Sequence, residues 1–113
     1  MPNIPTDDNH MICVIVRIKV SAGRRDDFLI EFRKIVPKVL AEEGCVEYGP
    51  WIDVPTNIEI QPPERTHTIV CVEKWESLDA LEAHLVTPHM IEFRKATEGL
   101  RAGIELEIIG PAE

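Results

Sequence analysis

The sequence lacks the features that bind nucleotides, nucleic acids or membranes. Its six glycines are scattered and form no Gly-x-Gly-x-x-Gly pattern, so a Rossmann-type site for flavin or nicotinamide is not expected. Lys and Arg total 12 against 20 Asp and Glu, and the net charge of -8 opposes binding to a phosphate backbone. No apolar run approaches the roughly 20 residues that a membrane helix needs. We therefore expect a cytoplasmic protein without nucleic-acid or membrane partners.

Cysteine and histidine are too sparse to suggest a disulfide framework or a metal centre. Three cysteines without a Cys-x-x-Cys pair are typical of reduced thiols, and apolar burial is their expected role. A metal site drawn from His67, Glu73, His84 and His89 is the alternative. His84 and His89 are five residues apart across a proline and match no ligand motif such as His-Glu-x-x-His. We expect neither a bound metal nor any other cofactor.

Hydrophobic periodicity predicts four strands separated by helical segments. The first strand is β-branched, with residues 12, 14, 16, 18 and 20 on one face, and Cys13 and Ile15 make its other face apolar as well. A second strand should end at Pro55, and the polar stretch 56–65 should connect it to the third. The predicted strands are residues 11–20, 45–54, 67–75 and 104–109.

The remaining apolar patterns repeat at helical spacing. The first helix should cover residues 24–43, beginning near Ser21 or Asp26 and ending at Gly44, and Pro37 should kink or break it. Ser77 can cap a short helix from 78 to 86, and Thr87 with Pro88 can start another that runs to about residue 100.

This order of elements predicts an α+β fold of the ferredoxin-like β-α-β-β-α-β type. Residues 1–10 are expected to form a flexible polar tail and residues 11–111 a single domain. Two helices, the second broken at Pro88, would cover one face of the sheet. Because the first strand is apolar on both sides, the other face should pair with a second copy, which predicts a homodimer.

Several segments resemble the bacterial quinol monooxygenases of the antibiotic biosynthesis monooxygenase superfamily. They are Lys34–Pro37, Glu42–Cys45, Trp75–Ser77, Leu81–Leu85 and Thr87–Met90. The resemblance spans roughly residues 11–111. It implies a dimeric α/β barrel in which each subunit oxidises a quinol-type aromatic substrate with dioxygen and without a bound cofactor.

A haem-degrading branch of the same superfamily uses an Asn, a Trp and a His at three positions. Here those positions hold Val16, His84 and Arg94, so none of the three matches. The departure argues against haem oxygenation by the mechanism of that branch.

Two histidines are candidate catalytic groups. His84 lies on the flank of the stripe formed by Leu78, Leu81 and Leu85, where an imidazole could accept a phenolic proton; a structural, hydrogen-bonded histidine is the alternative. His89 lies in the first turn of a helix, whose positive end disfavours imidazolium, and it could bind a quinolate oxygen or superoxide or act simply in capping.

Four further residues are candidate substrate-binding groups. Tyr48 and Trp75 could form flat apolar walls, although packing in the core is an equal alternative. Phe93 shares a helix face with His89. Glu73 shares a strand face with Trp75 and needs a partner, such as Arg17 on a neighbouring strand or a histidine.

Three functions are compatible with these residues. The first is a cofactor-independent monooxygenase that oxidises a quinol or polycyclic phenol with dioxygen, the substrate itself supplying the electrons. The second is a non-catalytic dimer that binds an aromatic or signalling metabolite, because fold alone does not determine function. The third is an isomerase of the same architecture, in which a histidine moves a proton without dioxygen.

Overall fold

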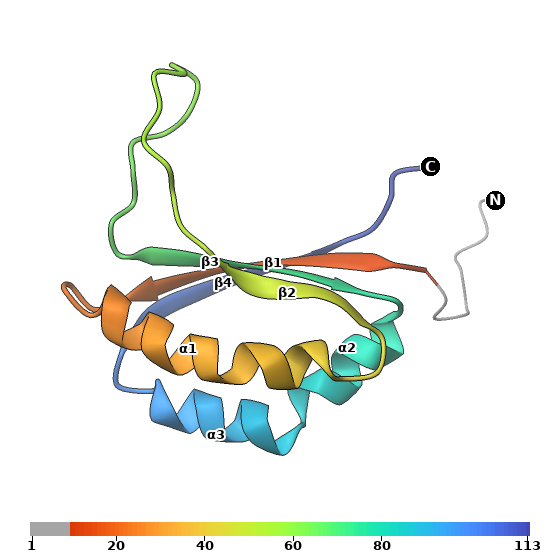
Figure 1. The fold of residues 1–113 in the computed structure, drawn as a ribbon. Helices are drawn as coiled ribbons and strands as arrows, with labels where there is room; N and C mark the ends of the chain where they lie inside the picture. The colour runs from red at the N-terminus through yellow and green to blue at the C-terminus, as the bar shows by residue number, and fades with distance from the viewer. Residues whose placement is uncertain (1–9) are drawn as a thin grey trace.

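The computed structural model describes residues 10–113, so residues 1–9 of the expected N-terminal tail lie outside the described part. Figure 1 shows one curved sheet with all the helices on one side of it. Within residues 10–113, every helix is too short or too polar to cross a membrane. In chain order the elements are β1 (Ile12–Val20), α1 (Arg25–Leu40), β2 (Cys45–Trp51), β3 (Thr68–Trp75), α2 (Leu78–Leu85), α3 (Pro88–Ala96) and β4 (Arg101–Ile109).

The sheet has the order β2-β3-β1-β4, and its neighbouring strands are antiparallel. This order and the β-α-β-β-α-β sequence confirm the predicted ferredoxin-like α+β fold. Val14 of β1 pairs with Glu73 of β3 on one side and with Ile108 of β4 on the other. Since facing partners share a side of the sheet, these three residues all point toward the helices.

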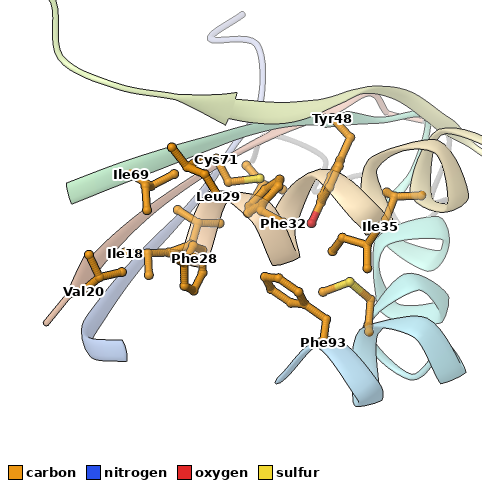
Figure 2. Packing of buried hydrophobic residues seen from close by; sticks show 14 of the residues in the cluster. Ile18, Val20, Phe28, Leu29, Phe32, Ile35, Tyr48, Ile69, Cys71 and Phe93 are labelled. Carbon is orange, nitrogen blue, oxygen red and sulfur yellow. The ribbon is translucent and has the colours of Figure 1, made fainter. Parts of the chain in front are cut away.

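Aromatic side chains fill the space between the sheet and the helices. Phe28 and Phe32 of α1 meet Phe93 of α3 edge to face, with ring centroids 5.6 Å apart in each pair. Tyr48 of β2 stacks on Phe32, and its hydroxyl points away from the sheet, between the helices (Figure 2). All three phenylalanines and the single tyrosine of the chain are thus concentrated in one cluster.

The first helix differs from the prediction at both ends. It begins at Arg25 with Arg24 at the N-cap, so Ser21 and Asp26 do not start it, and it ends at Leu40. Pro37 does not break the helix. Only three helical residues follow Pro37, and the one backbone donor that it removes lies in the last turn, where the disruption is smallest.

Side-chain and backbone hydrogen bonds determine the ends of the later elements. Ser77 caps α2 as predicted, since its Oγ accepts a hydrogen bond from the Ala80 amide at 3.1 Å. The hydroxyl of Thr87 instead donates to the His84 carbonyl at 2.9 Å and so joins the end of α2 to the start of α3. The third helix ends at Ala96, short of the predicted residue 100. The Leu100 carbonyl accepts a hydrogen bond from the Ser21 amide, and β4 therefore begins at Arg101, three residues before its predicted start.

The β2–β3 connection is longer than predicted. Strand β2 ends at Trp51, and the intervening chain rises from the sheet on the side away from the helices (Figure 1). Arg65 donates to both carboxylate oxygens of Asp53 at 2.8 Å, which closes the base of this loop. The same contacts lower the pKa of Asp53 to about 2.

The helices cover only part of the sheet face toward which they pack. Ile104 and Leu106 of β4 point to the helix side yet remain 60% and 57% exposed. The expectation that two helices cover this face is therefore correct for β2, β3 and β1 and wrong for β4. The uncovered strand leaves an opening into the interior.

Gly44 is the position where only glycine fits. Its φ is +83°, and an added Cβ would lie 2.6 Å from the Cβ of Ala80 on α2. We predict that Gly44→Ala lowers the free energy of unfolding by about 2–3 kcal/mol, from backbone strain together with overpacking. Urea unfolding of the variant and the native protein measures this change in free energy. Gly99→Ala is the control, since a Cβ added at Gly99 would have no neighbour within 4 Å, and an equal loss there would contradict the explanation.

Candidate active site

A cavity of ≈ 200 Å³ lies between the sheet and the helices. Its walls are mostly apolar and come from all four strands and all three helices, with Val16 and Phe32 on opposite sides. Such a cavity, apolar with a few convergent polar groups, is typical of small-molecule sites. The polar or ionisable side chains that line it are Tyr48, Cys71, Glu73, His84, Arg94 and Arg101.

Glu73 is a buried carboxylate on the floor of this cavity. Its Oε1 accepts a hydrogen bond from Trp75 Nε1 at 2.9 Å, and its Oε2 accepts from the Cys71 thiol at 3.6 Å. Burial raises the pKa of Glu73, partly opposed by the Trp75 donor and by His84. The suggested pairing with Arg17 is wrong, because Arg17 lies on the opposite face of β1 and forms an ion pair with Glu107.

Tyr48 and Cys71 add neutral donors to the same wall. Burial, reinforced by nearby acidic groups, raises the pKa of the Tyr48 hydroxyl and of the Cys71 thiol far above neutrality. Burial likewise raises the pKa of Cys45 to about 11. All three cysteines are free. Cys71 is buried as expected, whereas Cys13 and Cys45 are half-buried.

His84 is buried more deeply than its position on the helix predicted. Its exposure is 1%, whereas Leu78 and Leu85 are 40% and 46% exposed. The buried face of α2 is therefore formed by Leu81 and His84, and the expectation that His84 lies on the flank of a leucine stripe is wrong. The ring packs at 4.6 Å from Trp75 and its Nδ1 lies 2.9 Å from Oε2 of Glu42.

The other predicted site residues divide between two sides of the helical layer. Phe93 lines the cavity together with Tyr48, Glu73 and His84. Trp75 and His89 are not among the described residues that line it. Trp75 lies fully buried behind His84, and His89 lies in a groove on the outside, half-buried, with its Nε2 2.7 Å from Glu42.

Four residues of this region were not predicted from the sequence. Cys71 alternates with Ile69 and Glu73 along β3, so the strand period could have placed it. Arg94 and Arg101 lie at the cavity edge, where each donates to backbone carbonyls. Glu42 lies in the turn after α1, where no periodicity applies. In the sequence, Glu42 stood out only as part of the Glu42–Cys45 segment that resembles the family.

The described residues contain no group of three or more His, Cys, Asp or Glu side chains placed to hold a metal ion. Of the candidate ligands, His67 lies apart, before β3 and at the far end of that strand from Trp75. His84 lies 4.0 Å from Glu73, and both His84 and His89 contact the carboxylate of Glu42. The polar groups of the cavity are arranged as hydrogen-bonding and proton-accepting groups around an apolar space.

The buried charge of Glu73 should make stability depend on pH. Because its pKa is raised in the folded state, the folded protein holds this proton more tightly than the unfolded chain does. Its contribution to stability is therefore complete below about pH 4, the unfolded value, and is lost as the pH rises through the folded value. Glu73→Gln keeps an acceptor for Trp75 and cannot ionise.

We predict that the unfolding free energy of the native protein, relative to Glu73→Gln, falls as the pH rises above about 4 and through the folded pKa of Glu73. Urea unfolding at each pH measures the difference. Glu76→Gln removes an exposed carboxylate and controls for net charge. A difference that stays constant or rises with pH would show that folding does not raise the pKa of Glu73.

Comparison with known proteins places this chain in a family. Residues 11–96 match the antibiotic biosynthesis monooxygenase family. The chain is 40% identical over 103 residues to the "Probable quinol monooxygenase YgiN" of Escherichia coli, covering 89% of this chain and 98% of that protein.

Solved structures show the same architecture. PA3566 from Pseudomonas aeruginosa has a TM-score of 0.78 at 22% identity, covering 95% of this chain and 99% of its own. Rv0793 from Mycobacterium tuberculosis has a TM-score of 0.74 at 19% identity, covering 91% and 96%. These two likenesses demonstrate the fold alone. The match over residues 11–96 and the 40% identity establish more: this chain belongs to the antibiotic biosynthesis monooxygenase family.

Proposed function

We propose that this protein is a monooxygenase that oxidises a small quinol with dioxygen and needs no bound cofactor. The observation that carries the proposal is the buried imidazole of His84 at the wall of an apolar cavity, with Nδ1 paired to a carboxylate. The other ring nitrogen, Nε2, lies beyond hydrogen-bonding distance of Glu73 at 4.0 Å. The name of the Escherichia coli relative supports a quinol as the substrate.

The reaction balances without an external reductant. A quinol and dioxygen give a hydroxyquinone and water: one oxygen atom enters the ring and the other leaves as water. The quinol supplies all four electrons that dioxygen accepts. The protein then has to bind the quinol, remove a phenolic proton and exclude bulk water, because a quinolate transfers an electron to dioxygen far more readily than a quinol does.

Each part of the cavity has a role in this scheme. His84 Nε2 accepts the phenolic proton and later returns it to the reduced oxygen. Arg94 and Arg101 at the edge supply positive charge close to the quinolate. Phe32, Phe93 and Tyr48 form the aromatic walls. A volume of ≈ 200 Å³ favours a one- or two-ring quinol without a long side chain.

Oxygen uptake with a chemically reduced naphthoquinone tests the proposal. We expect enzyme-dependent consumption of one dioxygen per quinol and a hydroxynaphthoquinone as product, above the rate of autoxidation. Elemental analysis and the visible spectrum of the same preparation test cofactor independence. One metal ion or flavin per active chain would overturn that part. Tight quinol binding without oxygen uptake would instead support a ligand-binding protein, and anaerobic turnover an isomerase.

We also propose that the functional unit is a homodimer formed through the face without helices. Trp51 and Ile109 are exposed on this face. The β2–β3 loop rises from the same side (Figure 1) and exposes Ile58 and Ile60, the latter at 91%. Exposed apolar surface of this kind is typical of an association site. Light scattering at low micromolar concentration should give twice the chain mass, and a monomeric mass would contradict the proposal.

A further inference from the structure

The carboxylate of Glu42 binds the ring nitrogen of His84 that faces away from the cavity. We propose that Glu42 is a positioning residue: it accepts the Nδ1–H of His84, fixes the tautomer whose bare Nε2 faces the substrate, and stabilises the imidazolium formed during turnover. The inference rests on the proposed function. It adds to the site a residue that touches neither the cavity nor the reacting atoms.

The geometry of the pair is that of a carboxylate oriented on an imidazole. His84 Nδ1 lies 2.9 Å from Oε2 and 3.1 Å from Oε1 of Glu42. The side chains are 2% and 12% exposed, so solvent screens their attraction only weakly. At these distances an ionised carboxylate can only accept, and the nitrogen must therefore carry a proton. A neutral His84 then has its lone pair on Nε2.

The ring of His84 is fixed from its other sides as well. Trp75 packs against it at 4.6 Å, and Tyr48 meets it edge to face at 5.6 Å. Glu73 does not compete for the proton on Nδ1, because it faces Nε2. Its two oxygens accept from Trp75 and Cys71. The packing leaves Nε2 directed at the cavity and Nδ1 at Glu42.

A second histidine holds the carboxylate itself. His89 Nε2 lies 2.7 Å from Oε2 of Glu42, and it comes from the first turn of α3, whereas His84 comes from the last turn of α2. The carboxylate thus joins the C-terminus of one helix to the N-terminus of the next. This accounts for the position of His89 outside the cavity: it orients Glu42, and Glu42 orients His84.

The charge balance favours the same role. When His84 takes the phenolic proton, its ring becomes positive beside the carboxylate of Glu42 on Nδ1. Burial raises the pKa of Glu73, Tyr48 and Cys71 on the cavity side, which favours the neutral form of each. The arrangement parallels that of the carboxylate in a serine-protease triad, which holds the tautomer and stabilises the imidazolium.

The test combines kinetics with the protonation state of the ring. Glu42→Leu removes the acceptor and the charge, and Glu42→Gln removes the charge but keeps an acceptor oxygen. Glu43→Leu is the matched control, because it changes a neighbouring carboxylate for which no contact with either histidine is found. Nitrogen NMR of histidine-labelled protein reports which ring nitrogen is protonated. The His84→Asn variant identifies the His84 signals among those of the four histidines.

We expect native His84 to carry its proton on Nδ1, and Glu42→Leu to give a mixture of both tautomers. With a reduced naphthoquinone, kcat should fall roughly tenfold in Glu42→Leu with little change in KM, as when a partner that orients a functional histidine is lost. Glu42→Gln should lie between it and the native protein. Glu43→Leu should match the native protein in both measurements.

Three results would overturn the inference. They are a native His84 protonated on Nε2, a Glu42→Leu variant whose kcat stays within twofold of the native value, and a Glu43→Leu variant impaired as much as Glu42→Leu. The first needs no activity, so it decides the role of Glu42 even if Glu42→Leu does not fold. A native protein without oxygen uptake would refute the proposed function and the kinetic role of Glu42, while the NMR result would still decide its orienting role.

Discussion

His84→Asn should lower the turnover of a reduced naphthoquinone by on the order of a hundredfold, the usual range for loss of a general base. The asparagine amide can occupy the place of Nδ1 and donate to Glu42, which lies 2.9 Å from that nitrogen. It has no group in the place of Nε2. The variant therefore removes the proton acceptor and keeps the contact with Glu42, so the loss reports on proton abstraction.

Asparagine is a better choice than alanine because of where His84 lies. A side chain that is 1% exposed and packed on Trp75 leaves a cavity when truncated, and Glu42 would lose its partner. His84→Ala would thus lose stability as well as activity.

The dependence of His84→Asn on pH gives an independent check. A phenol loses its proton to solvent near pH 10, so raising the pH should partly restore the variant while changing the native enzyme less. Oxygen uptake is compared at temperatures well below the melting transition of each protein. His89→Gln, which alters a residue outside the cavity, should be impaired much less. An unimpaired His84→Asn would show that the base lies elsewhere, with Glu73, which also lines the cavity, the next candidate.

The order of strands and helices could be predicted because it depends on local periodicity. The β-branched run of β1 and the alternation in β3 fix which residues face the helices, and these include Glu73 beside Trp75. The ends of the elements could not be predicted in the same way. The hydrogen bond from Ser21 to the Leu100 carbonyl, between residues far apart in sequence, ends the last helical segment early.

The site was predictable where a side chain follows the period of its element. Tyr48 lies opposite Glu73 on the helix side of the sheet, and Phe93 lies on the inner face of α3. His84 was misplaced because the spacing of three leucines indicated a different buried face for α2. The angle of this short helix instead buries Leu81 and His84. Glu42 belongs to a turn, where residue spacing carries no information about direction.

Trp75→Ala should cost about 3–5 kcal/mol of unfolding free energy, the range for deleting a large aromatic side chain from a core. The indole has no exposed surface and packs against His84, and its Nε1 is the donor to Oε1 of Glu73 at 2.9 Å. Truncation therefore leaves a cavity and also removes a hydrogen bond from a buried carboxylate. The melting temperature should fall by on the order of 15 °C.

Trp75→Phe separates these two effects. It keeps most of the ring and loses only the N–H donor, so we expect a smaller cost of about 1–3 kcal/mol that grows as the pH rises and Glu73 ionises. The growth with pH follows because the indole donor stabilises the ionised form of Glu73 more than the neutral one and so opposes the rise in its pKa caused by burial. Calorimetry and urea unfolding between pH 4 and pH 7 measure both variants. Val86→Ala, at an exposed position after α2, serves as the control. A Trp75→Phe cost that does not change with pH would show that the indole acts on Glu73 through packing alone.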